Sequence, residues 1–273
     1  MLARQRHEMI LEMLKKNGTV HTARLTEEMK VSSETIRKDL DFLEQAGLLT
    51  RVHGGAVPVS QEAFPDQEAG SGYVSVQIRN TQHVAQKSSI ALAAAGLVRE
   101  EQVIALDYGS TSQVLAAELT KRFRKLTVIT NSIQSALILA EAPDFTVIMT
   151  GGVLDRKEYT LVNDFTPLLD HIHIDLLFMT VSGIDPAVGC TDLRFGEARI
   201  QNEMRRAASK TVVLADSSKL GRASLVKICA VRDVDCIITD EGITPQIAQA
   251  LREAGTELLI AKGEGGSAPP TYL

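Results

Sequence analysis

The chain has 273 residues, 44% of them hydrophobic, and a formal net charge of −5. This composition excludes a disordered chain, and the length suits about two domains. No apolar stretch reaches the roughly 20 residues that span a bilayer, so we expect no membrane partner. The first 14 residues mix apolar and charged side chains, unlike a secretion signal, and we therefore expect a cytoplasmic protein.

The cysteines and histidines indicate neither a disulfide framework nor a metal site. Cys190, Cys229 and Cys236 are an odd number and lack the CxxC spacing. His171 and His173 alternate before an apolar run, but no third ligand follows them at a zinc-like spacing. We therefore expect no metal and no cofactor.

The first 57 residues carry the periodicity of a small helical domain. Helices are predicted at 4–16, 22–29 and about 33–46, and Ser32 or Ser33 can cap the third of them. The apolar stripe of the third helix consists of Ile36, Leu40 and Leu43. Two helices joined by a tight turn are typical of a helix-turn-helix, in which the second helix enters the major groove of DNA.

A hairpin predicted at 48–56 completes a winged helix-turn-helix. Once the apolar stripe is buried, the hydroxyls and cations of the third helix face outward, where they suit bases and phosphates. The predicted DNA-binding residues are Ser33, Thr35, Arg37 and Lys38 on the helix, with Arg51 and His53 on the wing. Residues 1–57 hold nine basic and eight acidic side chains, so DNA affinity depends on where the charges point. The spacing alone leaves open a three-helix bundle with a solvated charged face.

Residues 58–80, punctuated by proline and glycine, are predicted to link the domain 1–57 to a second domain at 81–273. After a helix at about 81–99, short apolar runs alternate with helices, which predicts an α/β fold with a mainly parallel sheet covered on both faces. The predicted strands are 103–107, 126–130, 145–150, 176–181, 211–216, 236–240 and 257–261. The predicted helices among them are 111–121, 132–141, 196–209 and 244–254.

Polar residues follow five of the predicted strands. The strand ends contain Asp107-Tyr108-Gly109-Ser110-Thr111, Thr130-Asn131-Ser132, Thr150-Gly151-Gly152, Ser182-Gly183-Ile184-Asp185 and Ala215-Asp216-Ser217-Ser218-Lys219. Ligands of open parallel sheets bind beyond the carboxyl ends of the strands, and glycines, hydroxyls and helix amides suit phosphate oxygens. The pattern predicts a site for a small anionic ligand, with ordinary turns and helix caps as the alternative.

The sequence resembles the DeoR family of bacterial regulators over about residues 4–262. The run 31–40 (Val-Ser-Ser-Glu-Thr-Ile-Arg-Lys-Asp-Leu) and the ending 51–56 (Arg-Val-His-Gly-Gly-Ala) are similar to the family's signature. The resemblance implies a winged helix-turn-helix with Thr35, Arg37 and Lys38 on the DNA side. Asp39 is expected to have a structural role, because an acid there would not face phosphate.

In the second half, the family's motifs Thr-Asn-Ser, Gly-Gly, Gly-Ile-Asp and Ala-Asp-Ser-Ser-Lys are matched. They imply a sugar-phosphate-binding domain similar to ribose-phosphate isomerases, with the phosphate cradled by Gly109, Ser110 and Thr111. The other effector-binding residues expected from the resemblance and the strand ends are Asp107, Asn131, Gly151, Gly152, Ser182, Gly183, Asp185 and Lys219. Two departures from the family pattern are Tyr108, which could narrow or stack over the pocket, and Gln201, where a basic residue is common.

These observations predict a transcriptional regulator, a repressor of a carbohydrate-metabolism operon, and not an enzyme. The expected partners are double-stranded operator DNA, a phosphorylated sugar effector and further copies of the chain in a dimer or tetramer. The alternative is a sugar-phosphate isomerase with an added DNA-binding module, in which Asp107, Asp185 or Asp216 could be the general base. A pure interaction scaffold would leave the polar strand ends unexplained.

Overall fold

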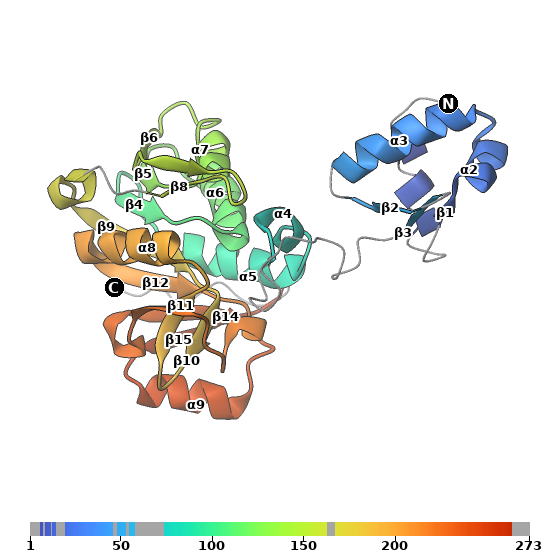
Figure 1. The fold of residues 1–273 in the computed structure, drawn as a ribbon. Coiled ribbons are helices and arrows are strands. Elements are labelled where there is room, and N and C mark those ends of the chain that lie inside the picture. The colour runs from blue at the N-terminus through green and yellow to red at the C-terminus, as the bar shows by residue number, and fades with distance from the viewer. Residues whose placement is uncertain are drawn as a thin grey trace. The chain divides into compact units, whose positions relative to one another are not determined.

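The computed structural model describes residues 6–7, 9–11, 13–14, 20–45, 48–52, 55–57, 74–162 and 167–263. The chain divides into two compact units, residues 1–72 and 73–273 (Figure 1). No helix among the described residues is long and apolar enough to cross a membrane.

The first unit is a winged helix-turn-helix. Its elements are the helical residues 6–7, 9–11 and 13–14, strand β1 (Val20–His21), helices α2 (Thr22–Met29) and α3 (Ser33–Gln45), and the hairpin strands β2 (Thr50–Val52) and β3 (Gly55–Val57). The turn between the two helices is tight because Lys30 adopts a left-handed conformation with φ 52°. Strand β1, which the sequence did not predict, pairs with β3 and gives the antiparallel order β1-β3-β2.

Asp39 connects helix α3 to the first helix. Its carboxylate accepts hydrogen bonds from Arg6 Nε at 2.6 Å, Arg6 Nη2 at 2.9 Å and His7 Nε2 at 2.9 Å. Burial of Asp39 alone would raise its pKa, but these donors outweigh burial and hold the pKa below its usual value. Its burial between α3 and the first helix confirms the predicted structural role.

Seven parallel strands form the main sheet of the second unit, in the order β15-β14-β12-β9-β4-β5-β6. In chain order they are β4 (Val103–Leu106), β5 (Thr127–Thr130), β6 (Thr146–Met149), β9 (Ile174–Thr180), β12 (Ala208–Leu214), β14 (Cys236–Asp240) and β15 (Glu257–Ala261). All seven coincide with predicted strands. The chain enters the sheet at β4, continues outward to β6 and returns at β9, so the topology switches between β4 and β9.

Helices cover both faces of this sheet (Figure 1). They are α5 (Val84–Ala95), α6 (Ser110–Arg122), α7 (Ile133–Leu139), α8 (Phe195–Ala207) and α9 (Pro245–Glu253). Along β9, Leu176 and Phe178 pack into the hydrophobic cluster beneath α5, α6 and α7, whereas Leu177 and Met179 pack into the cluster that α8 and α9 cover. Because successive side chains of β9 point to opposite faces, the sheet contributes to a hydrophobic cluster on each of its two faces.

Several short elements of the second unit were not predicted from the sequence. They are the hairpin β7 (Val153–Asp155) and β8 (Thr160–Val162), the antiparallel strands β10 (Gly183–Asp185), β11 (Gly189–Asp192) and β13 (Val226–Cys229), and the 3-10 turns Pro167–His171, Ser217–Lys219 and Val231–Asp233. Polar residues interrupt these segments of three to five residues, so they show neither a continuous apolar run nor a period. In the predicted linker, 58–73 lie outside the described residues, and Val76–Arg79 forms helix α4 of the second unit.

Candidate functional site

The exposed side of α3 begins at a hydroxyl cap. The Thr35 amide donates to Ser32 Oγ at 3.1 Å, and the two hydroxyl oxygens lie 2.9 Å apart. Ser33, Arg37 and Lys38 are exposed, whereas Ile36 and Leu40 are buried on the opposite side of the helix. The structure thus brings Ser33, Thr35, Arg37 and Lys38 to the surface of one helix.

The wing is attached to α3 by polar contacts. Arg51 forms an ion pair with Asp41, and its backbone amide donates to Glu44 Oε1 at 2.8 Å. The Arg51 side chain is 28% exposed, so its guanidinium lies at the surface while it contacts α3. His53, the other predicted wing residue, lies outside the described residues.

A pocket in the second unit opens at the carboxyl ends of β9 and β12, beside the topological switch. It is lined by Arg79, Gln82, His83, Lys87, Ser110, Thr111, Thr180, Val181, Leu214, Ala215, Asp216 and Lys219. Ser110 and Thr111 form the first turn of α6, where backbone N–H groups have no partner within the helix. A helix N-terminus and two hydroxyls therefore face the same hollow as three long cationic side chains.

The charge of the pocket is predominantly positive. Arg79, Lys87 and Lys219 lie in its wall with one carboxylate, that of Asp216. Lys87 is buried, and its Nζ donates to the backbone carbonyls of Arg79 and Gln82. Burial lowers the pKa of Lys87 to about 8 and also lowers that of Lys219, with Asp216 opposing the shift in both. Near neutral pH this wall attracts anions.

Asp107 lies beneath the pocket and is not in its lining. Its carboxylate accepts from Thr180 N at 2.8 Å, Thr180 Oγ1 at 3.0 Å, Ser112 Oγ at 2.9 Å and Gln201 Nε2 at 2.9 Å. Complete burial raises the Asp107 pKa to about 7 despite these donors. Asp107 therefore joins β4, β9 and α8, and Gln201 is one of the residues that hold it.

Gly109 brings α6 against β9. Its φ of 137° and ψ of 158° lie in a region that residues with a side chain rarely adopt, and a Cβ there would lie 2.5 Å from Thr180 Oγ1. That hydroxyl contacts both Asp107 and the Tyr108 carbonyl. Gly109 is therefore required for the close approach that positions Ser110 and Thr111.

The other predicted effector residues lie outside the pocket lining. Asn131 is buried, and neither of its amide atoms has a hydrogen-bond partner among the described residues; Gly151 and Gly152 follow β6 in left-handed conformations. Asp185 accepts from the amides of 187 and 188, Gly183 packs against the Arg222 carbonyl, and Ser182 donates to Asp192 at 3.2 Å. Of the predicted set, the structure thus brings Ser110, Thr111 and Lys219 together.

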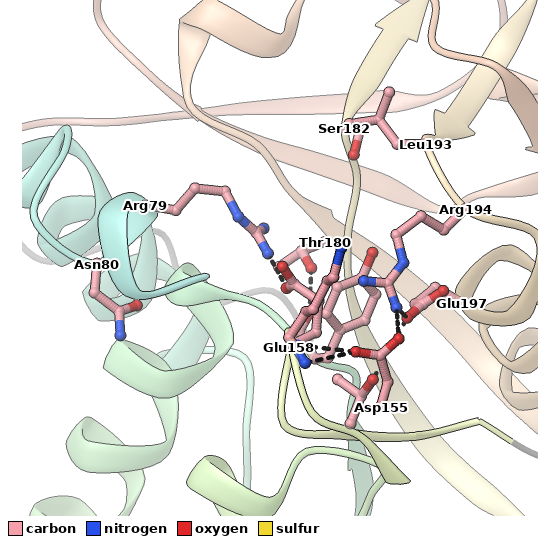
Figure 2. A network of polar contacts seen from close by, with 12 residues as sticks. Arg79, Asn80, Asp155, Glu158, Thr180, Ser182, Leu193, Arg194 and Glu197 are labelled. Atoms are coloured by element: carbon pink, nitrogen blue, oxygen red, sulfur yellow. Dashed lines mark hydrogen bonds and ion pairs between the residues drawn. The ribbon is translucent and has the colours of Figure 1, made fainter. Parts of the chain in front are cut away.

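A network of polar contacts that includes Arg79, Glu158 and Arg194 lies next to the pocket (Figure 2). The Tyr108 hydroxyl donates to Asp192 at 3.0 Å, and the Arg79 guanidinium lies 5.9 Å from the centre of the Tyr108 ring. The ion pairs of the network are Arg79–Glu158, Arg194–Asp155 and Arg194–Glu197. Tyr108 is thereby buried in the network and does not line the pocket, contrary to the expectation that it could narrow it.

Arg79, Gln82, His83 and Lys87 are pocket residues that the sequence analysis missed. They precede the first strand of the sheet, so a search of strand ends could not find them. The described residues contain no cluster of His, Cys, Asp or Glu suited to a metal ion.

Solved structures similar to the chain include ribose 5-phosphate isomerase A from Methanocaldococcus jannaschii, at 21% identity and a TM-score of 0.38, covering 49% of this chain and 52% of that one. Another is eIF2B beta from Chaetomium thermophilum, at 12% identity and a TM-score of 0.39, with 56% and 48% covered. Likenesses this weak carry no functional argument.

Two segments of the chain match two domains of one protein family. Residues 6–62 match the DeoR-like helix-turn-helix domain, and residues 82–241 match the DeoR C terminal sensor domain. The HTH-type transcriptional regulator GolR of Listeria innocua is 34% identical, with 94% of this chain and 98% of that protein covered. A putative aga operon transcriptional repressor of Escherichia coli O157:H7 is also 34% identical, with 94% and 93% covered. These relatives are regulators and not isomerases, and the chain belongs to the DeoR family of DNA-binding transcriptional regulators.

Proposed function

We propose that the protein represses a carbohydrate-metabolism operon under the control of a phosphorylated sugar bound in the pocket of the second unit. The observation that carries this proposal is the convergence of Arg79, Lys87 and Lys219 on the N-terminus of α6. Phosphate oxygens are recognised by such combinations of cations, hydroxyls and helix amides.

The pocket also offers hydrogen-bonding groups for the hydroxyls of a sugar phosphate. The Asp216 carboxylate can accept from sugar hydroxyls, and Gln82 adds an amide that can both donate and accept. A relative from Haemophilus influenzae, 28% identical with 95% of this chain and 97% of that protein covered, is named a glycerol-3-phosphate regulon repressor. That name says that the relative represses a regulon for glycerol 3-phosphate, a phosphorylated polyol, and it supports the same ligand class here.

On the DNA side, we assign operator contacts to the exposed residues of α3 and to the wing. The residues are Ser33, Thr35, Arg37, Lys38, Arg51 and His53. One winged helix reads only a short site, so we infer a dimer or tetramer that reads paired half-sites. Sedimentation at micromolar concentration tests this inference, and a monomer both with and without DNA would contradict it.

The decisive experiment places a negative charge where the phosphate would bind. A labelled operator complex is titrated with a panel of sugar phosphates and with the corresponding unphosphorylated sugars. The wild type should respond only to a phosphorylated compound, and Ser110→Asp should bind operator but no longer respond, because like charges repel. Thr244→Asp is the matched control, since Thr244 caps α9 outside the pocket and Asp is also a good cap.

An undiminished response of Ser110→Asp would show that the phosphate binds elsewhere. If Ser110→Asp itself alters operator binding because the new carboxylate mimics the ligand, Lys219→Met decides the question. That variant removes a pocket cation without adding an anion, and it should weaken the response to the same compound.

A further inference from the structure

Arg79 has two roles in the structure at once. It lines the pocket, and its Nη2 forms an ion pair with Glu158 (Figure 2). The Arg79 side chain is 21% exposed, whereas that of Glu158 is 1% exposed. The Nε of Arg79 is buried and lacks a hydrogen-bond partner among the described residues. The guanidinium therefore keeps donor capacity while it neutralises a buried carboxylate.

Glu158 is held in place by its own hairpin. It lies in the turn between β7 and β8, where its amide donates to Asp155 Oδ1 at 3.2 Å. The hairpin is docked on the end of β5 and the start of α7, since Leu161 N donates to the Asn131 carbonyl at 2.7 Å and Ile133 N to the Tyr159 carbonyl at 2.9 Å. A buried carboxylate is costly unless it is paired, and Arg79 supplies a cation to Glu158.

The backbone of Arg79 is held from the pocket side. Lys87 donates to the Arg79 carbonyl, and Asn80 Nδ2 donates to Gln113 Oε1 of α6 at 3.0 Å. Helix α4 is thus fixed at its carboxyl end, and the long Arg79 side chain extends from it toward Glu158 and the pocket. Two anions that bind this guanidinium at the same time would repel each other, so each would weaken the interaction of the other with Arg79.

We propose that Glu158 competes with the ligand's phosphate for Arg79 and thereby sets the affinity of the pocket. This inference rests on the proposed function, because it takes phosphate as the anionic group. Ligand binding then weakens the ion pair between α4 and the β7–β8 hairpin. Since α4 is the first described element after β3, this change occurs where the chain enters the second unit.

The test measures binding of inorganic phosphate to the full-length protein by isothermal titration calorimetry. Glu158→Gln keeps the shape and an acceptor but removes the competing charge, and it should bind phosphate about tenfold more tightly, equivalent to about 1.4 kcal/mol. Asp155→Asn is the matched control on the same hairpin, because Asp155 pairs with Arg194, which does not line the pocket. Its affinity should stay within about twofold of wild type.

A second measurement separates competition for Arg79 from general repulsion. In an Arg79→Gln background, Glu158→Gln should no longer improve phosphate binding. A full gain in that background, or an equal gain from Asp155→Asn, would overturn the proposal. If Glu158→Gln does not fold, Glu158→Asp replaces it, and its shorter reach should still raise the affinity severalfold.

The outcomes also distinguish this inference from the proposed function. Phosphate binding that is equal in wild type and Glu158→Gln, and that Ser110→Asp abolishes, overturns only the role of Glu158. Absence of phosphate binding from wild type and every Glu158 variant contradicts both.

Discussion

Replacing Gly109 by alanine should cost the second unit about 4 kcal/mol of unfolding free energy. Holding a residue with a side chain at this φ and ψ costs roughly 1–3 kcal/mol. The new Cβ would also meet Thr180 Oγ1 at 2.5 Å and displace a hydroxyl that donates to buried Asp107, a further ~1–3 kcal/mol. For a unit of this size the sum corresponds to a fall of about 12 °C in Tm.

Gly255→Ala separates the two contributions. Gly255 also has a positive φ, 95°, but among the described residues its Cβ would meet only Arg232 Cβ, at an ordinary 3.6 Å. This control should therefore lose only the backbone contribution, about 2 kcal/mol. Thermal unfolding gives both Tm values, and phosphate titration should show weaker binding for Gly109→Ala alone. Equal Tm losses in the two variants would refute the reasoning about Thr180 and Asp107.

Three further outcomes are expected. Asp39→Asn should lower the unfolding free energy of the first unit by about 2 kcal/mol at pH 7, as chemical denaturation can measure. Because the folded-state pKa of Asp39 is lowered, the wild type should lose the same stabilisation as the pH falls through that pKa. A variant as stable as the wild type at pH 7 would contradict this. The affinity of the pocket for phosphate should decrease as the pH rises above about 8, because Lys87 loses its proton there. Calorimetry at pH 7 and about 9.5 tests this, and an unchanged affinity would count against a role for the Lys87 charge. Lys38→Ala should weaken operator binding and reduce the slope of log affinity against log salt by about one, as fluorescence anisotropy can show, whereas an unchanged slope would remove Lys38 from the phosphate contacts.

The sequence predicted most of the fold because the strands of the main sheet are largely apolar runs. The central strands are buried on both faces, and all seven strands coincide with runs found in the sequence. The helix-turn-helix followed equally from the spacing of Ile36, Leu40 and Leu43, which are buried together. The β7–β8 hairpin was missed, because its strands are short and half-exposed and have no apolar period.

The pocket was predicted less completely for two physical reasons. The position of a residue at a strand end does not determine where its side chain points, and Asp107 turns inward to Thr180 and Gln201. Arg79 and Lys87 reach the pocket from α4 and α5, across a turn rather than along the sheet. Their role depends on how α4 packs, and no local pattern in residues 58–80 indicated that helix.

The order of the strands also has a consequence for synthesis on the ribosome. The chain completes β4, β5 and β6 before β9 and β12 emerge, so one half of the sheet can assemble first. Ser110 and Thr111 belong to that early half, whereas Thr180, Asp216 and Lys219 come from the late one. A nascent chain that stops before β12 therefore has Arg79, Lys87 and the hydroxyls of the pocket but lacks Asp216 and Lys219. The proposed effector site is in this sense complete only in the finished domain.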